Sequence, residues 1–445
     1  MPILNTVELH GHVLRSPSGI RIITTLNDYN LKPFGICSAL SKAGTKNMKL
    51  TQRMKYLAFI ISVLCMTAAC ATPPPISVDE ALTAAKEEKL LWRQAQEEQQ
   101  VLDDSGWLYR DAEIETYLNE VAAKLKAFTD SPDISFNIKI INDPHLNAFA
   151  FPNGVIYVHT GVLARMENEA QLAALLAHEM SHCTQRHALR LLKSLKDRPA
   201  HIAALQHALE KMAMIQGLAR ILGVNGSMAA VSGYTREFEA EADRVGLDLM
   251  AKAGYDPKQA LNLFEQLRQE IESEGIKEPF FFGSHPSVQQ RIENAGLWLD
   301  TRYSGSDAGI KNSTIFRSRL NRLILENARL DLRIGRFLVA QKGVEKYLLL
   351  NPNDAGAHYL LGEIFRQHGR QGDIKTAIRQ YQEAIKLDPL FPEPHKAMGL
   401  TYFKEGERHL AQKFFESCLL LSPDAPDKAY IQGYLQRCKN NGEDS

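Results

Sequence analysis

The sequence has 445 residues, of which 44% are hydrophobic and 23% charged, so it can form two or three domains with apolar cores. That composition excludes an intrinsically disordered or fibrous chain. Basic and acidic residues number 52 each, so no overall charge attracts nucleic acid, and we expect no nucleic-acid partner.

The most apolar segment, Tyr56 to Ala69, is typical of an export signal. It is shorter than the roughly 20 residues of a membrane span, follows basic residues and ends in small ones. We expect residues 54–71 to be a signal peptide. Two cleavages fit: Cys70 ends a stretch that resembles a bacterial lipobox and would then be lipidated, or ordinary signal peptidase cuts after Ala71.

Residues 1–53 precede this signal, whereas an export signal should begin near the first residue. We therefore expect them to be a non-native extension, with the true start at Met48 or Met54. The alternative is an organelle transit peptide, which is disfavoured because the extension is not notably rich in Arg or Ser.

Helical periodicity first extends from about residue 72 to residue 128. Two β-prone runs follow at residues 134–141 and 147–158, and the turn residues Pro152-Asn153-Gly154 predict a hairpin within the second run. Helical periodicity returns at residues 170–192 and again at residues 236–253. We expect one domain over residues 75–315, mostly α-helical with a small β-sheet.

Residues 316–445 are predicted to form a repeat array. Tetratricopeptide repeats have a period of about 34 residues with small, aromatic and proline markers. Pro389 and Pro423 are 34 residues apart, a more degenerate unit ends at Pro352, and a last helix near residues 429–438 would cap the stack. Two full marker sets agree in phase: Gly362, Phe365, Ala377, Tyr381, Ala384 and Pro389, then Gly399, Tyr402, Ala411, Phe415 and Pro423. The pattern favours a tetratricopeptide-repeat α-solenoid over generic helical hairpins.

The segment His178-Glu179-Met180-Ser181-His182 is a candidate metal site. Residues four apart on a helix share one face, so both imidazoles can bind one zinc ion while Glu179 holds a water without being a ligand. Bound zinc lowers the pKa of that water and the carboxylate takes its proton, which is the chemistry of metal-assisted peptide hydrolysis. If His178 and His182 were only core residues, a buried Glu179 would be costly without a partner.

An open catalytic zinc site needs a third protein ligand. Gln185 and Ala188 stand where the metzincin pattern requires Gly and His, so that class is excluded. His187 and Cys183 are out of phase with the histidine pair on a continuous helix, which predicts supporting or packing roles for both.

Helical phase distinguishes the carboxylates of the acidic helix predicted at residues 236–253. Glu237 and Glu241 lie on the charged face, opposite the apolar stripe. Glu239 lies at the edge of the stripe, where a carboxylate can be both buried and neutralised by a metal. Phase therefore favours Glu239 as the third ligand, and Asp243, one turn further on, could orient a ligand histidine.

Five segments in the same order resemble the gluzincin metallopeptidases of the CAAX-prenyl-protease type: residues 147–163, 177–187, 237–246, 253–257 and 281–292. The resemblance implies a gluzincin protease domain that binds one Zn²⁺ per chain. The ligands that it implies are His178, His182 and Glu239, in agreement with the helical phase.

The resemblance also implies supporting residues. Asp243 would assist a ligand histidine, and His285 matches a histidine that can approach the zinc and hold the site shut. Arg291 would pair with a carboxylate or help to stabilise the oxyanion. An edge strand would bind extended substrate through backbone hydrogen bonds. The residues of that strand are Asn147, Ala148 and Phe149.

Together with the export signal and the repeats, the resemblance implies a periplasmic zinc endopeptidase that degrades misfolded or stalled outer-membrane proteins. It would be anchored to the outer membrane if Cys70 is lipidated. The repeats would dock substrate or the β-barrel assembly machinery. The alternative is a repeat-based chaperone or scaffold for outer-membrane protein assembly, with a self-inhibited protease site.

Overall fold

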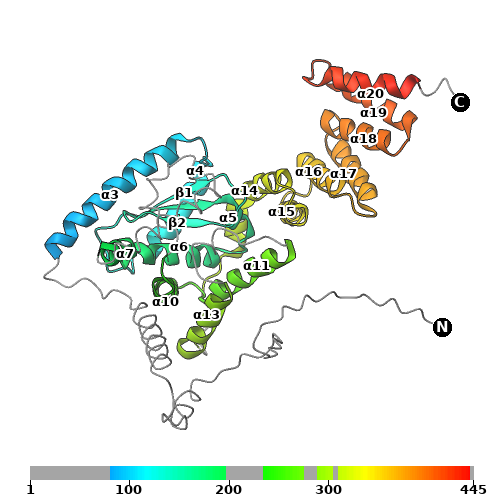
Figure 1. Ribbon diagram of the computed structural model, residues 1–445. Coiled ribbons are helices and arrows are strands. Elements are labelled where there is room, and N and C mark those ends of the chain that lie inside the picture. Colours follow the sequence, from blue (N-terminus) through cyan, green and yellow to red (C-terminus); the bar gives the residue numbers. More distant parts are fainter. Residues whose placement is uncertain (1–80, 197–233, 275–287, 304–308, 441–445) are drawn as a thin grey trace, which may run out of the picture. The chain divides into compact units, whose positions relative to one another are not determined.

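The computed structural model describes residues 81–196, 234–274, 288–303 and 309–440 (Figure 1). All of them belong to the compact unit that begins at Thr72. The predicted signal peptide and His285 lie outside the described residues. Among the helices of the described ranges, none combines the length and apolarity needed to cross a membrane.

The described residues up to 303 contain eight helices and three strands, and we call this part the N-terminal module. Its elements are α3 (Ala81–Asp104), α4 (Ala112–Lys126), β1 (Asn137–Ile141), β2 (Ala148–Ala150), β3 (Val155–His159), α5 (Thr160–Arg165), α6 (Glu169–Thr184), α7 (His187–Lys196), α10 (Arg236–Lys252), α11 (Lys258–Glu274) and α13 (Val288–Arg302). The prediction of a mostly helical fold with a small β-sheet is confirmed.

The sheet has the strand order β1-β3-β2, with β1 parallel and β2 antiparallel to β3. The predicted hairpin is therefore confirmed as β2 and β3. Gly154 in its turn has a φ of +94°, and a Cβ there would lie 2.5 Å from the carbonyl oxygen of Ser135, so the turn requires glycine. Because β3 lies in the middle, β2 forms one edge of this sheet.

Helix α6 lies at the centre of the N-terminal module, because every residue from Glu169 to Cys183 is buried. A helix that is covered on all sides must be apolar all round, which its Ala- and Leu-rich first half satisfies. The sequence predicted one helical block over residues 170–192, and this prediction is wrong. The block divides at Arg186, whose φ is +53°, and α7 begins at His187.

The carboxylate of Glu169 fixes the start of α6. It accepts hydrogen bonds from the hydroxyls of Tyr117 (2.7 Å) and Tyr255 (2.6 Å), from the ammonium of Lys124 (3.1 Å) and from the amide of Asn312 (3.1 Å). Burial alone would raise the pKa of Glu169, but these donors hold it below its usual range. One buried anion thus joins α6 to α4 and to the segments before α11 and α14.

The C-terminal part consists of paired helices, as the repeats predicted. These repeat helices are α14 (Ser313–Arg333), α15 (Phe337–Leu348), α16 (Ala355–His368), α17 (Asp373–Leu387), α18 (Pro392–Lys404), α19 (Arg408–Leu421) and the last helix, α20 (Lys428–Asn440). A Cβ at Gly362 would lie 2.4 Å from the ring of Tyr381, and one at Gly399 would lie 2.6 Å from the ring of Phe415. The marker glycines thus allow each helix pair to close on a buried aromatic ring.

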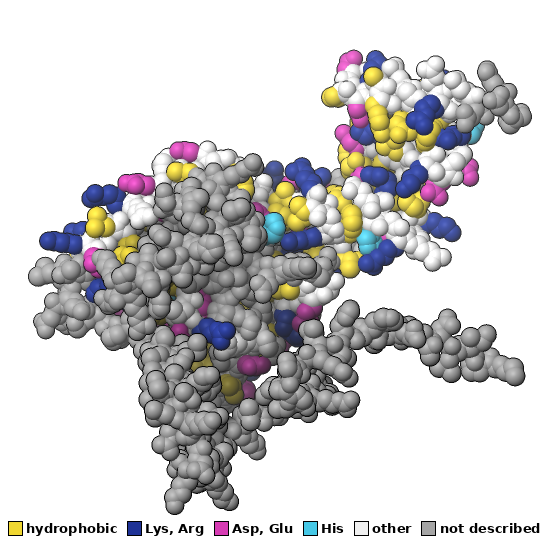
Figure 2. Space-filling model, viewed as in Figure 1, with side chains coloured by type: hydrophobic (Ala, Val, Ile, Leu, Met, Phe, Trp, Pro, Cys, Tyr) yellow, Lys and Arg dark blue, Asp and Glu magenta, His cyan; other side chains and the backbone are white. Residues whose placement is uncertain are grey.

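Two of the sequence's six cysteines lie together in the last helices. Cys418 and Cys438 are both buried in the apolar cluster between α19 and α20, and both are free thiols. On the surface of the repeat helices, hydrophobic side chains alternate with Lys and Arg (Figure 2). The most exposed large apolar residues of this part are Leu349, Leu390 and Leu420.

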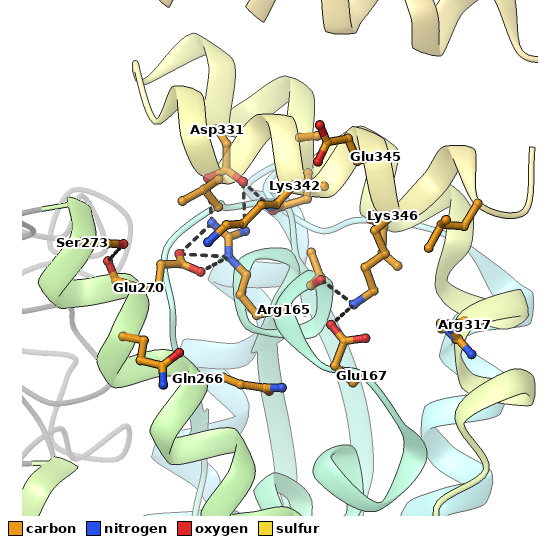
Figure 3. A pocket seen from close by; sticks show the side chains of 18 residues that line it. Arg165, Glu167, Gln266, Glu270, Ser273, Arg317, Asp331, Lys342, Glu345 and Lys346 are labelled. Atoms are coloured by element: carbon orange, nitrogen blue, oxygen red, sulfur yellow. Dashed lines mark hydrogen bonds and ion pairs between the residues drawn. The ribbon is translucent and has the colours of Figure 1, made fainter. Parts of the chain in front are cut away.

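Buried charges join the repeat helices to the N-terminal module (Figure 3). Arg165, at the end of α5, donates to both carboxylate oxygens of Glu270 on α11 and lies 2.9 Å from the carboxylate of Asp331 on α14. Lys346 on α15 donates to the backbone carbonyls of Ala164, near the end of α5, and of Met166, just after it, and to Glu167 at 3.0 Å. These residues line a hollow of about 660 Å³.

Candidate metal centre

The two histidines of the motif and one carboxylate come together where α6 crosses α10. One nitrogen of His178, one nitrogen of His182 and one oxygen of Glu239 all lie within 4.8 Å of one another, and the three residues are buried. Gly246 allows the close approach of the two helices, because a Cβ there would lie 3.0 Å from the backbone nitrogen of His178. Glu237 is exposed and outside the cluster, as the helical phase predicted.

The separations of the donor atoms are close to those around a single zinc ion. The Nε2 atoms of His178 and His182 are 3.1 Å apart, and the first lies 3.5 Å from Oε2 of Glu239 and the second 3.5 Å from Oε1. Ligand atoms at the usual zinc distances in tetrahedral geometry would be separated by roughly 3.3–3.6 Å. Two imidazoles and a carboxylate are also a donor set that zinc binds in catalytic sites. The cluster can therefore hold a metal ion.

The second nitrogen of His178 faces a buried ion pair. Its Nδ1 lies 2.9 Å from the carboxylate of Asp243, which also accepts from Arg291 at 2.6 Å. Burial and Arg291 would lower the pKa of His178, but Asp243 and Glu239 outweigh them and raise it to about 9. Burial would raise the pKa of Asp243, but Arg291 and His178 hold it below its usual range. Asp243 is therefore an anion that accepts hydrogen bonds from both neighbours.

Arg291 comes from α13, and its guanidinium also stacks on Phe264, 4.3 Å from the ring centre. Two roles were open for this residue, pairing with a carboxylate or stabilising an oxyanion. The structure places the guanidinium on Asp243, with two Nε contacts of 3.2 and 3.1 Å in addition to the Nη2 contact. Arg291 thus lies behind His178 and is 2% exposed.

The second nitrogen of His182 faces His187, for which the sequence predicted a supporting or packing role. The two Nδ1 atoms are 2.9 Å apart. On the other side of its ring, Nε2 of His187 lies 3.4 Å from the carboxylate of Glu241, which accepts from Arg190 at 2.8 Å. Burial lowers the pKa of His187 to about 4, with Arg190 acting in the same direction and Glu241 opposing it. His187 is therefore neutral at pH 7.

Aromatic rings hold these imidazoles in place. Tyr234 stacks on His182, with ring centres 4.2 Å apart and planes at 12°. Phe238 stacks on His187 at 4.6 Å and 18°, and the guanidinium of Arg190 covers the Phe238 ring at 4.6 Å. The sequence placed Phe238 only on the apolar stripe of its helix, and it predicted a place at the site for neither aromatic residue. Their position in and just before the first turn of α10 is the feature that could have pointed to them.

The remaining predicted site residues lie around α6. Glu179 is 2% exposed and follows His178 on the same helix. The thiol of Cys183 donates to the backbone carbonyl of Phe151 at 3.3 Å, which joins α6 to the chain just after β2. Ala148 and Phe149 begin β2, the sheet edge that precedes this contact, and Asn147 immediately precedes the strand. The prediction for His285 concerns a residue outside the described ranges.

Comparison with known proteins identifies two kinds of domain in this chain. Residues 109–298 match the model of peptidase family M48, and residues 370–406 and 397–425 match models described as TPR repeat and tetratricopeptide repeat. A putative beta-barrel assembly-enhancing protease of Vibrio cholerae is 31% identical over 246 residues, which are 52% of this chain and 50% of that protein.

Two further relatives match over similar lengths. The beta-barrel assembly-enhancing protease of Escherichia coli is 31% identical over 44% of this chain and 40% of its own. The mitochondrial metalloendopeptidase OMA1 of Schizosaccharomyces pombe is 29% identical over 41% of this chain and 52% of its own. The chain spans about half the length, or less, of these relatives. It carries a peptidase family M48 domain, followed by C-terminal tetratricopeptide repeats.

Proposed function

We propose that this chain is a zinc-dependent endopeptidase of the cell envelope that degrades misfolded or stalled outer-membrane proteins. The observation that carries the proposal is the buried cluster of His178, His182 and Glu239 next to Glu179. Bound zinc would polarise the scissile carbonyl and lower the pKa of a water. Glu179 would take the proton of that water, since it shares α6 with the two histidine ligands but is outside their cluster.

The edge strand β2 supports an endopeptidase acting on extended polypeptide. An extended chain can add to a sheet edge through backbone hydrogen bonds, which are largely independent of its sequence. Asn147, Ala148 and Phe149 would offer this edge, close to α6 through the contact between Cys183 and Phe151. Such binding suits unfolded chains of many sequences.

The proposed location and partners rest on other features. The predicted export signal at residues 54–71, with Cys70 as an optional lipid anchor, favours the periplasm. Relatives named beta-barrel assembly-enhancing protease favour substrates among outer-membrane β-barrel proteins. The repeats would then hold the substrate or the β-barrel assembly machinery, because stacked helix pairs present extended binding surfaces.

The test compares two variants of the purified full chain, Glu179→Gln and Glu237→Gln. Glu237 is an exposed carboxylate on α10 outside the cluster, so its variant is the matched control. Each is assayed for cleavage of an unfolded outer-membrane protein, and bound zinc is measured by atomic emission. We expect Glu179→Gln to lose cleavage by about 10²- to 10⁴-fold with zinc retained, and the control to cleave normally. Cleavage by Glu179→Gln at the wild-type rate would refute the proposal.

A second candidate function is that of a repeat-based chaperone or scaffold with a self-inhibited protease site. The observation that favours it is the burial of His178, His182, Glu179 and Glu239, each at most 3% exposed, since a polypeptide must reach these residues to be cleaved. If this function dominates, a chain with Glu179→Gln should restore growth to a strain that lacks the protein as well as the wild type does. If proteolysis is needed, the same variant should fail.

A further inference from the structure

We infer that His187 is a positioning residue that fixes the tautomer and orientation of His182 for metal binding. The inference rests on the proposed metal site. Sequence reasoning, which assumed one continuous helix, gave His187 no defined partner. The structure gives it one, through the left-handed turn at Arg186 between α6 and α7.

The geometry assigns a direction to each hydrogen bond. Nε2 of His182 points to the cluster, 3.1 Å from Nε2 of His178 and 3.5 Å from Glu239, so a metal would bind that atom. A ligand nitrogen carries no proton, and the proton of a neutral imidazole must then reside on Nδ1. Nδ1 of His187 lies 2.9 Å from Nδ1 of His182. Because the His182 nitrogen carries the proton, Nδ1 of His187 can only accept the hydrogen bond between them.

The remaining contacts complete the same assignment. Since Nδ1 of His187 accepts, its own proton is on Nε2, which faces the carboxylate of Glu241 at 3.4 Å. Arg190 donates to the same Glu241 oxygen at 2.8 Å and so fixes the carboxylate. The order of donation is therefore His182 to His187 to Glu241. Reversal would place a proton on the nitrogen of His182 that faces the metal.

Packing leaves the His187 ring little freedom. It is 0% exposed and lies between His182 and Phe238, stacked on the latter with ring centres 4.6 Å apart. The two histidine ligands thus have different supports. Asp243, an anion, accepts from His178, whereas a neutral imidazole accepts from His182. Because partners behind metal-bound histidines commonly change metal affinity by roughly 10- to 100-fold, removing this acceptor should be measurable.

The test uses the full chain reconstituted with Co²⁺, whose visible absorption reports ligand geometry. His187→Phe keeps a ring against Phe238 but removes the acceptor, and His187→Gln keeps an acceptor oxygen. We expect His187→Phe to bind Co²⁺ roughly 10- to 100-fold more weakly, with altered absorption, and His187→Gln to recover part of the affinity. Wild-type affinity and absorption in His187→Phe would overturn the inference.

A third variant keeps the test decisive if His187→Phe does not fold. Glu241→Ala removes the carboxylate that accepts the last hydrogen bond in the series from His182 to His187 to Glu241. Its side chain is 22% exposed, and the substitution should weaken Co²⁺ binding by a few-fold. Unchanged Co²⁺ affinity in Glu241→Ala would then overturn the inference. Failure of the proposed function has a different signature: a wild-type chain that binds Co²⁺ and Zn²⁺ but cleaves no polypeptide.

Discussion

Replacing Gly246 by alanine should disturb the metal centre without changing any proposed ligand side chain. A Cβ at this position would lie 3.0 Å from the backbone nitrogen of His178, whereas ordinary contact begins at 3.4 Å. Helices α6 and α10 must therefore separate by about 0.4 Å. Functional sites tolerate displacements of only about 0.5 Å, and α10 carries both Glu239 and Asp243.

Two opposing effects on the free energy of unfolding decide the result of Gly246→Ala. Alanine gains about 1 kcal/mol over glycine in a helix interior, and overpacking of a core costs about 1–3 kcal/mol. Gly246→Ala should thus lower the free energy of unfolding by up to about 2 kcal/mol and weaken zinc binding by roughly tenfold. The matched control is Gly296→Ala on α13, where a Cβ would meet nothing within 4 Å and should stabilise the fold by about 0.5–1 kcal/mol.

Urea unfolding, zinc affinity in competition with a chelator, and the rate of polypeptide cleavage are the three measurements. The reasoning is refuted if Gly246→Ala is stabilised as much as Gly296→Ala and binds zinc with wild-type affinity. Loss of stability alone, with zinc affinity retained, would refute the claim that helix spacing determines the metal geometry.

Three more predictions concern buried charges. The pKa of Glu169 is lower in the folded state, so its contribution is present above the unfolded value of about 4.3 and is lost as the pH falls through the folded pKa. Glu169→Gln should cost about 1–3 kcal/mol of unfolding free energy at pH 7 and less in acid, and an equal loss at both pH values would contradict this. Arg291→Met leaves Asp243 buried without its guanidinium, and should cost about 3–5 kcal/mol in urea unfolding. The double variant with Asp243→Asn should lose less than the sum, whereas additive losses would mean that the two side chains do not interact. Arg165→Met removes the guanidinium that pairs with both Glu270 and Asp331, and should also lower the free energy of unfolding by about 3–5 kcal/mol. A free energy of unfolding within about 0.5 kcal/mol of wild type would contradict the importance of these buried ion pairs.

The proposed ligands could be predicted from sequence because helix geometry is local. The spacing of His178 and His182 depends only on the turn of one helix, and the phase of Glu239 depends only on the pattern of another. The repeat period is equally local, which is why the helix pairs were predicted correctly. In these cases the sequence pattern within one or two helices is enough to predict which residues lie on the same face.

The supports behind the ligands could not be predicted in the same way. The division of the helix at Arg186 has no glycine or proline to mark it; the Arg186 side chain is held by Glu88 and Asp133, which are distant in sequence. That turn decides where His187 lies. Likewise, the two β-prone runs did not indicate that β1 pairs in parallel with β3 and leaves β2 at the sheet edge, because this pairing joins strands that are separated in sequence by β2.

Helix α14 begins at Ser313 and so spans the boundary expected between the two predicted domains at residue 316. Its buried residues Phe316, Leu320 and Leu323 belong to the same apolar core as α6. Repeats beyond α14 could therefore be added or lost without uncovering this core. Removing α14, in contrast, would expose the apolar residues that it covers to solvent. In hydrogen exchange, the amides of α14 should open together with those of α6 as one cooperative unit, while the last repeats open independently.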